Sequence, residues 1–337
     1  MSTLRIGMAK WDAHRSHEWY GSRFPVLGCN YLPKTAVNST EMWQRQTFDR
    51  KTINAELALA GETGLNSIRV FLPYIVWEQD AGAFISVFDE FLGIAATHGL
   101  SVLPVLFDDC SFSRKEPYLG EQDAPVPGVH NSGWTASPGF ARADDPSYRP
   151  KLRGYVQDLV RTFQKDGRVL AWDIYNEPGN SGRGSRSLPL LEAAFAWGRE
   201  INPIQPFTTG AWNWEGPMDA VNQAALELSD IVSFHSYGDL PMITEQAESL
   251  RRYDRPILCT EWLNRKYGKV ETHLPFFRQE GIGAYHWGFV TGKTQTNLHW
   301  STMSGAPDAN PDIWQHDLYH ADHSPYCAKE IALFKER

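Results

Sequence analysis

The chain has 337 residues, of which 42% are apolar and 21% are charged, a composition typical of a soluble globular protein that can bury a sizeable core. Its formal net charge of −8 argues against a nucleic-acid partner, because phosphates attract positive surfaces, and gives no reason to expect an anionic membrane partner. The 13 tryptophans and 13 tyrosines are more than core packing usually requires.

The sequence has no pattern typical of a signal peptide or a membrane span. Residues 1–12 include no apolar stretch of signal-peptide length, and no run of 18 apolar residues occurs. The four cysteines have no paired spacing, and three fall in or at the end of predicted strands, where a thiol packs as a small apolar group. They are Cys29, Cys110, Cys259 and Cys327. We expect reduced cysteines and a cytoplasmic protein, although a secreted chain trimmed of its leader would have the same sequence.

Short apolar runs alternate with amphipathic stretches along the chain. In residues 152–163, apolar side chains recur at helical spacing, and residues 88–99 end on a glycine suited to a helix C-terminus. The apolar runs rarely alternate polar and apolar residues, which is typical of strands covered on both faces in a parallel sheet. The predicted strands are 26–31, 67–72, 101–107, 169–175, 207–211, 230–235, 256–260 and 283–288.

Eight strands alternating with helices over roughly 300 residues predict an α/β fold, a single (β/α)8 TIM barrel spanning residues 1–337. A doubly wound open sheet is the alternative, but no glycine-rich phosphate-binding turn follows the first strand. Two connections are unusually long, residues 111–146 after the third strand and residues 289–323 after the eighth. Both follow strand C-termini, where barrel enzymes place their active sites, so we expect both loops to be functional.

Two glutamates stand at the ends of two of these strands. Glu177 ends the sequence Trp-Asp-Ile-Tyr-Asn-Glu, and Glu261 ends Ile-Leu-Cys-Thr-Glu. Cleavage of a glycosidic bond requires a carboxylic acid that protonates the leaving oxygen and a carboxylate on the other side of the sugar carbon. Asn176 adds an amide suited to bond a sugar hydroxyl beside the scissile bond. The pattern therefore predicts a glycoside hydrolase.

With Asn-Glu-Pro after the fourth strand, the chain resembles the clan A glycoside hydrolases, whose acid/base ends strand four and whose nucleophile ends strand seven. Within this clan it is most similar to family 5, the cellulase-like family, and its relatives, over residues 27–287. The resemblance implies that Glu177 is the acid/base and Glu261 the nucleophile of a retaining, double-displacement reaction. It also implies that no metal or other cofactor is needed.

Further residues match motifs of that family. Arg69 matches the strand-two arginine that bonds the nucleophile, and such a cation keeps a neighbouring carboxylate ionised. His235 and Tyr237 match the strand-six His-x-Tyr, in which the tyrosine contacts the nucleophile and the histidine lies near the acid/base. Trp287 matches the strand-eight tryptophan that floors the subsite of the attacked sugar.

One position departs from the family pattern. Family 5 commonly has a histidine at the end of strand three, where this chain has Asp108 and Asp109. An acidic pair there is suited to bind hydroxyls of the non-reducing sugar, which favours an exo-acting enzyme over an endo-cellulase.

Five tryptophans fall at or just after predicted strand ends. Because aromatic faces stack on sugars, we expect about half of the five to lie in the cleft and the others to pack on top of the barrel. Trp172, inside a strand, is expected to pack. The five are Trp77, Trp212, Trp214, Trp262 and Trp287.

A metal-dependent barrel hydrolase is a competing interpretation. His316, His320 and His323 are interleaved with Asp317 and Asp322, and an i, i+4 histidine pair on a helix can bind zinc. The sequence that follows, Ser-Pro-Tyr, instead indicates a loop. Zinc content and sensitivity to chelators distinguish this interpretation.

The predicted function is a retaining glycoside hydrolase with a carbohydrate substrate. We expect exo-action on small oligosaccharides or glycosides of glucose, xylose, galactose or arabinofuranose, because the long loops are placed to close one end of the cleft. Two alternatives use the same glutamates: an endo-acting β-glycanase of the xylanase, cellulase or mannanase type, and a transglycosylase. A sugar-binding barrel without catalysis is disfavoured, because every expected catalytic position is filled. The sequence ranks neither these sugars nor the oligomeric states.

Overall fold

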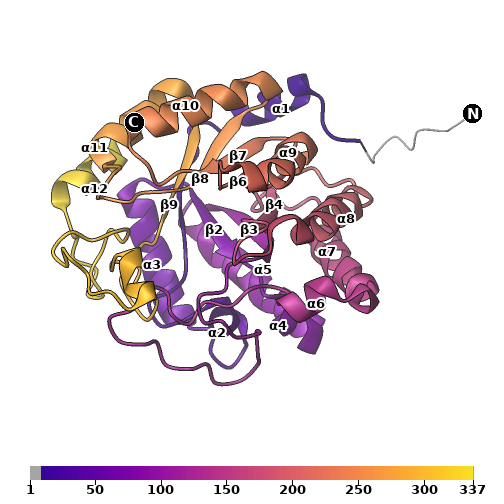
Figure 1. The fold of residues 1–337 in the computed structure, drawn as a ribbon, viewed down its shortest axis with the longest axis horizontal. Coiled ribbons are helices and arrows are strands. Elements are labelled where there is room, and N and C mark those ends of the chain that lie inside the picture. Colours follow the sequence, from indigo (N-terminus) through magenta and orange to yellow (C-terminus); the bar gives the residue numbers. More distant parts are fainter. Residues whose placement is uncertain (1–8, 337) are drawn as a thin grey trace, which may run out of the picture.

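The computed structural model describes residues 9–336 and shows a barrel of parallel strands inside a ring of helices (Figure 1). No signal peptide is predicted in residues 1–12. Of these, residues 1–8 lie outside the described residues. Every strand pairing is parallel, in the order β5-β4-β3-β2-β1-β9-β8-β7-β6. The strands are β1 (Leu27–Asn30), β2 (Ser67–Phe71), β3 (Ser101–Asp108), β4 (Trp172–Asn176), β5 (Phe207–Thr208), β6 (Gly210–Ala211), β7 (Val232–His235), β8 (Ile257–Trp262) and β9 (Gly283–Trp287).

The fifth predicted strand, residues 207–211, is present as two short strands, β5 and β6. Between them, the Thr209 backbone N–H donates to Ser229 Oγ at 3.0 Å instead of to a neighbouring strand. Because β5 pairs with β4 and β6 pairs with β7, this interrupted segment joins the two edges and closes the barrel. The predicted (β/α)8 barrel is confirmed, with β5 and β6 together forming one of its eight strands.

The other predicted strands are present with small shifts at their ends. β4 begins at Trp172 instead of residue 169, because Val169 forms only an isolated bridge with Val102. β8 continues two residues beyond the predicted end, so Glu261 belongs to the strand. A register irregularity in the pairing of β8 with both neighbours accompanies this extension.

Helices cover the outside of the barrel. The longest, α5, begins after Asp80, whose side chain accepts a hydrogen bond from the Ala83 N–H at 2.9 Å, and it buries Phe84, Phe88 and Phe91 against the barrel. No helix of residues 9–336 has the length and apolar character needed to cross a membrane. The helices are α1 (Ala13–Gly21), α2 (Ser39–Trp43), α3 (Arg50–Thr63), α4 (Tyr74–Gln79), α5 (Ala81–Thr97), α6 (Phe140–Asp144), α7 (Arg149–Phe163), α8 (Leu188–Arg199), α9 (Asp219–Leu228), α10 (Leu240–Leu250), α11 (Val270–Glu280) and α12 (Ala328–Lys335). Five short 3₁₀ turns complete the elements of the described chain: Pro146–Tyr148, Gly184–Ser187, Gly216–Met218, Arg251–Tyr253 and Trp300–Ser304.

The barrel interior is apolar at one end and polar at the other. Its N-terminal end is filled by an apolar cluster that includes Leu103, Leu258 and Tyr285, with Tyr20 of α1 packed below. Toward the C-terminal ends of the strands, the inward positions carry the buried charges of Arg69 and Asp173. The buried charges of the interior therefore lie toward the C-terminal face, whereas hydroxyl pairs such as Tyr285 with Ser67 also occur deeper in the barrel.

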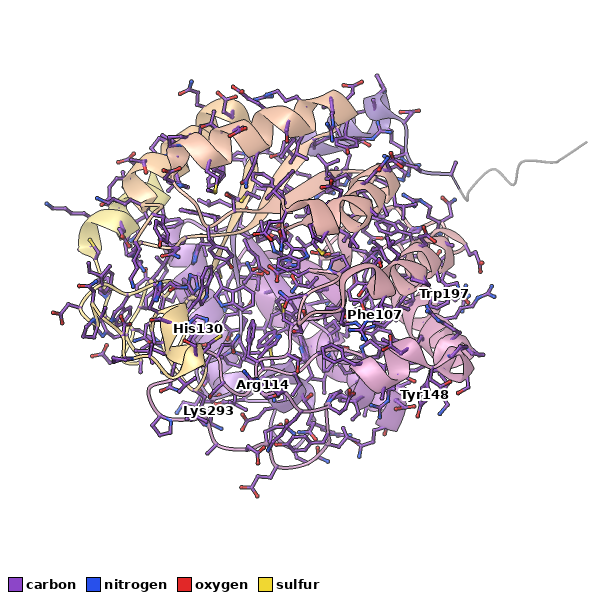
Figure 2. The ribbon with its side chains drawn as sticks, in the orientation of Figure 1. Phe107, Arg114, His130, Tyr148, Trp197 and Lys293 are labelled. Carbon is purple, nitrogen blue, oxygen red and sulfur yellow. The ribbon has the colours of Figure 1, made fainter. Side chains whose placement is uncertain are left out.

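The two long loops contact each other at this face. The Asn131 N–H donates to the Thr294 carbonyl at 2.7 Å, and the His130 N–H donates to Thr302 Oγ1 at 3.0 Å. The Gln295 side chain donates to the Val126 carbonyl at 2.8 Å. Figure 2 shows His130 beside the C-terminal loop, which is yellow in the ribbon. The loops thus form one joined wall along one side of the barrel mouth.

Candidate active site

A cleft of about 990 Å³ opens at the C-terminal face of the barrel. Glu177 and Glu261 both line it, as do the predicted site residues Asn176, His235, Tyr237, Trp212, Trp214 and Trp287. Arg69 lies buried below it, whereas Asp108, Asp109 and Trp262 are not among its lining residues. Five of the described lining side chains are acidic and none is lysine or arginine, so the cleft is suited to neutral ligands and unsuited to anions.

Glu261 is held from two sides at the end of β8. Arg69 Nη1 donates to its Oε1 at 2.8 Å, and the Tyr237 hydroxyl donates to its Oε2 at 2.7 Å. Both oxygens are therefore oriented by donors from elsewhere in the barrel, Arg69 in β2 and Tyr237 just after the end of β7. This is the environment predicted for a nucleophilic carboxylate.

Arg69 is wholly buried and connects several strands below the cleft. Its Nε and Nη2 donate to Asp173 Oδ2 at 3.0 and 2.8 Å, and its Nη1 also donates to Asn30 Oδ1 at 2.6 Å. Its Nη2 donates to Asn176 Oδ1 at 2.7 Å. Asp173 compensates the buried guanidinium charge, which keeps the planar donor set fixed beneath Glu261.

Glu177 follows β4 with a backbone φ of +42°, a conformation that is uncommon for residues other than glycine and costs of order 1–3 kcal/mol. Its Oε1 lies 2.8 Å from His235 Nδ1. Its Oε2 accepts hydrogen bonds from Cys110 Sγ, at 3.2 Å, and from Asn180 Nδ2. These partners are neutral hydrogen-bonding groups, in contrast to the guanidinium that binds Glu261.

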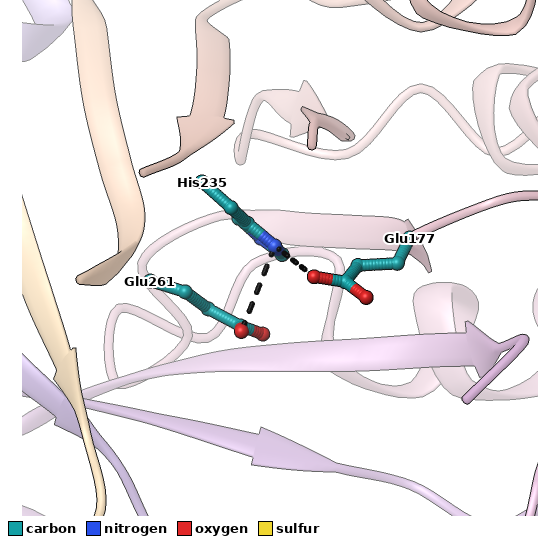
Figure 3. Close-up of side chains that lie close together, drawn as sticks. All are labelled: Glu177, His235 and Glu261. Carbon is teal, nitrogen blue, oxygen red and sulfur yellow. Dashed lines mark hydrogen bonds and ion pairs between the residues drawn. The ribbon is translucent and has the colours of Figure 1, made fainter. Parts of the chain in front are cut away.

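The two carboxyl groups meet around His235 (Figure 3). One oxygen of Glu177, one oxygen of Glu261 and a ring nitrogen of His235 all lie within 4.8 Å of one another. His235 Nδ1 lies 3.6 Å from Glu261 Oε2. This spacing could also accommodate a metal ion, but Arg69 already balances the charge of Glu261 and His235 Nδ1 is already hydrogen-bonded to Glu177.

The protonation of the site follows from burial and from these partners. Burial raises the pKa of Glu177, and the hydrogen bonds from Cys110 and Asn180 oppose the rise only in part. Burial and the neighbouring Glu177 carboxylate also raise the pKa of Glu261, whereas His235, Arg69 and the Tyr237 hydroxyl lower it. A positive guanidinium at 2.8 Å favours the ionised form more than neutral donors do, so a proton shared by the pair belongs on Glu177. Burial lowers the pKa of His235 to about 4, which keeps the ring neutral near pH 7.

Asp108 and Asp109, expected to bind sugar hydroxyls, both have protein donors as partners and do not line the cleft. Asp108 accepts hydrogen bonds from Trp134 Nε1 at 2.7 Å and from Asn176 Nδ2 at 2.8 Å. Asp109 points to the outside of the barrel, where it pairs with Arg183 at 3.0 Å. It also accepts the N–H of Gly179 at 2.7 Å and thereby fixes the turn that follows Glu177.

This network also alters the role expected for Asn176. Its Oδ1 accepts a hydrogen bond from Arg69, and its Nδ2 donates to Asp108. The amide therefore positions charged groups at the base of the cleft. It borders the cleft, but both of its polar atoms already have protein partners.

Three of the five tryptophans expected at strand ends line the cleft: Trp212, Trp214 and Trp287. Trp262 is wholly buried on the opposite face of β8, stacked on His273 of α11, and Trp77 donates to Asp158 outside the barrel. Trp172 packs in the core as predicted.

The histidine site proposed for a metal is not formed. His316 is buried and bonded to the Leu263 carbonyl, His320 is exposed and packs on Trp314, and His323 lies 3.2 Å from Lys34 Nζ. The segment is a loop, as its sequence indicates, and its histidines face different surroundings.

Several residues of the site were not predicted. Asp173 could have been found, because it is a charged residue inside an otherwise apolar strand. The lining residue Cys110 follows β3, and His130, Asn131, Trp134 and Trp300 belong to the long loops, where no local pattern indicates which side chains face the cleft.

Comparisons with known proteins agree with this fold. No protein-family model matches the chain. A curated protein of Aspergillus terreus, described as "Probable mannan endo-1,4-beta-mannosidase C", is 24% identical over 193 residues, covering 46% of this chain and 47% of that protein. The chain therefore spans about half the length of this curated relative.

Solved structures are similar over nearly the whole chain. An exo-β-1,4-mannosidase from Opitutaceae bacterium strain TAV5 has a TM-score of 0.66 at 16% identity, covering 99% of this chain and 62% of that one. An endo-β-1,4-mannanase from Thermotoga petrophila has a TM-score of 0.58 at 13% identity, covering 94% and 77%. A glycoside hydrolase family 5 mannosidase from Rhizomucor miehei has a TM-score of 0.56 at 13% identity, covering 91% of each chain. At these identities the likeness confirms the predicted resemblance at the level of the fold.

Proposed function

We propose that the chain is a retaining, exo-acting β-glycosidase for neutral sugars, with β-mannosides as its first candidate substrates. The observation that carries this proposal is the pair Glu177 and Glu261, whose nearest oxygens lie within 4.8 Å. Retaining glycosidases hold their carboxyl groups about 5–5.5 Å apart, whereas inverting enzymes need a wider gap for a water molecule. The unequal partners of the two carboxyls support unequal roles.

In the proposed reaction, Glu261 attacks the anomeric carbon while Glu177 protonates the departing glycosidic oxygen. Arg69 and Tyr237 orient the attacking carboxylate. The glycosyl–Glu261 ester is then hydrolysed by water, which Glu177, now ionised, deprotonates. Loss of that water proton to Glu177 restores the starting state of the enzyme.

Exo-action is supported by the joined wall of the two long loops. The direct bonds from His130 and Asn131 to the second loop close one side of the cleft. A polymer threading through the cleft would have to displace this wall, whereas a chain end could fit against it. The leaving group would then lie on the Glu177 side, where Trp212 donates to the Pro178 carbonyl at 3.0 Å.

The choice of mannose as the first candidate sugar rests on the names of the similar proteins. The curated relative and the three structures described above are named as mannosidases or mannanases, both endo- and exo-acting. From sequence alone, mannose entered only through the endo-acting mannanase alternative and was not among the sugars expected for an exo-acting enzyme. The lack of lysine and arginine among the described lining residues supports a neutral sugar of this kind.

Two assays of the wild-type chain test the proposal. Hydrolysis of aryl β-glycosides of mannose, glucose, galactose, xylose and arabinofuranose identifies the sugar, and we expect β-mannoside to be preferred. Time-resolved product analysis with a reduced β-1,4-mannooligosaccharide then tests the mode of attack. Exo-action at early times releases mannose and the reduced chain shortened by one sugar, whereas early release of internal fragments contradicts it. Inactivity on all substrates contradicts the proposed function as a whole.

A further inference from the structure

Asn131 is a buried amide without a hydrogen-bond partner in the wall of the cleft. Its side chain is 0% exposed, and neither its Oδ1 nor its Nδ2 has a partner among the described residues. Leaving such a group unpaired costs about 1–3 kcal/mol, so native proteins rarely bury one without reason. Its backbone has a φ of +47° and its N–H ties the two long loops together, which fixes where the side chain lies.

A second polar group lies next to Asn131 in the same wall. His130 Nδ1 lies 2.8 Å from the Leu298 carbonyl, which can only accept, so this nitrogen carries the proton. Burial lowers the pKa of His130 to about 4, and the neutral ring therefore presents Nε2 as an acceptor. The wall thus offers the donor and acceptor of an amide and the acceptor of an imidazole.

The aromatic side chains around Asn131 and His130 are suited to contact the apolar face of a sugar ring. Trp134, Trp287 and Trp300 line the same part of the chain's cleft, and Trp134 packs edge-on against Trp287 at 5.7 Å between ring centroids. Aromatic faces with a few neutral hydrogen-bonding groups recognise the apolar faces and hydroxyls of an uncharged sugar.

We propose that Asn131, assisted by His130, determines specificity by hydrogen-bonding hydroxyls of the non-reducing terminal sugar against the joined wall of the two loops. The inference rests on the proposed function and adds to it which residues recognise the sugar. The amide is covered in the structure, so a sugar reaches it by a small displacement of the side chains that cover it. Asn131 thereby links exo-action to sugar recognition, because the residue that binds the terminal hydroxyls also joins the loops.

Asn131→Leu tests the inference, because leucine has a similar size and no polar atoms. We expect kcat/KM on the preferred aryl glycoside to fall about 10- to 100-fold, the effect of losing hydrogen bonds to a sugar. The thermal unfolding midpoint should change little, because removal of two unpaired buried polar atoms stabilises the chain while a φ of +47° strains leucine more than asparagine. A merely structural role predicts a lower midpoint.

A series of monodeoxy glycosides gives a second readout. Removing the hydroxyl that Asn131 binds should lower kcat/KM of the wild type about 10-fold or more but leave Asn131→Leu nearly unaffected. Asn38→Leu is the matched control, because Asn38 is a buried asparagine of the same region whose amide is fully paired with Gln122, Gly133 and Glu41. We expect this control to lower the unfolding midpoint without changing the discrimination among deoxy sugars.

The outcomes separate the inference from the proposed function. If the wild type is active but Asn131→Leu loses less than about 3-fold, or loses the same factor on every deoxy sugar, the inference alone is overturned. A fall in the unfolding midpoint that accompanies a uniform loss of activity also overturns it. A wild type that hydrolyses no glycoside overturns both.

Discussion

Arg69 and Glu261 form an ion pair of 2.8 Å in which the arginine side chain is 0% and the glutamate side chain 5% exposed. The same guanidinium binds Asp173 of β4 and Asn30 of β1. The candidate nucleophile is therefore oriented by groups on rigid strands of the barrel, with no mobile loop between them. Preorganisation of this kind fixes a reacting group without reorganisation during the reaction.

Arg69→Lys should impair both stability and activity. An ammonium group cannot bind Asp173, Asn176 and Glu261 together, so buried acceptors and charges are left unpaired. We expect a loss of about 3 kcal/mol in the free energy of unfolding, measured by urea denaturation, and a drop in kcat/KM of at least about 100-fold. Arg153→Lys, in an exposed pair with Glu200, is the control and should cost less than about 1 kcal/mol. Equal effects of the two substitutions would contradict this role for Arg69.

Glu177→Ala should make the rate depend on the leaving group. Without the acid, a poor leaving group departs unprotonated, so we expect kcat/KM on such glycosides to fall about 10³- to 10⁴-fold. A dinitrophenyl glycoside needs little protonation and should lose far less in this first step. The comparison of kcat/KM across aryl leaving groups measures the effect. The same loss for all leaving groups would argue against Glu177 as the acid.

The pH profile should have two limbs set by the two glutamates. Activity rises with pH as Glu261 loses its proton and falls as Glu177 loses its own, and burial raises the pKa of both above that of an ordinary glutamate. His235, with a pKa of about 4, stays neutral above about pH 5 and should produce neither limb.

Tyr237→Phe assigns the acidic limb. The Tyr237 hydroxyl stabilises the ionised form of Glu261 by a bond of 2.7 Å, so its removal raises the Glu261 pKa. We expect the acidic limb of kcat/KM to move up by about one pH unit while the alkaline limb stays in place. A shift of the alkaline limb alone would show that the assignments of the two carboxyls are reversed.

The elements that could be predicted from sequence are those with a local signal. Apolar runs located the strands, and Glu177 and Glu261 lie at the ends of two of them, while Arg69 is the charged residue inside a third. The misplaced residues, Asp109 and Trp262, also lie near strand ends, but successive side chains of a strand point to opposite faces. Each follows an inward-facing neighbour and so points outward to the helices.

Features that depend on distant parts of the chain could not be predicted in this way. The interruption at Thr209 depends on Ser229, and the position of Asn131 in the wall depends on Thr294. No local sequence pattern around Thr209 or Asn131 indicates these contacts. The identity of the sugar could not be predicted either, because the residues that we propose to recognise it, Asn131 and His130, belong to a long loop.

Chemical rescue with azide tests whether Glu261 is the nucleophile of a retaining glycosidase. Glu261→Ala should lose nearly all hydrolysis of the preferred aryl β-glycoside, and added azide should restore turnover by taking the place of the carboxylate. We expect an α-glycosyl azide, of inverted configuration, whereas Glu192→Ala on the outer surface of α8 should retain full activity without forming it. A variant that keeps its activity, or a rescued product of retained configuration, would contradict this role of Glu261.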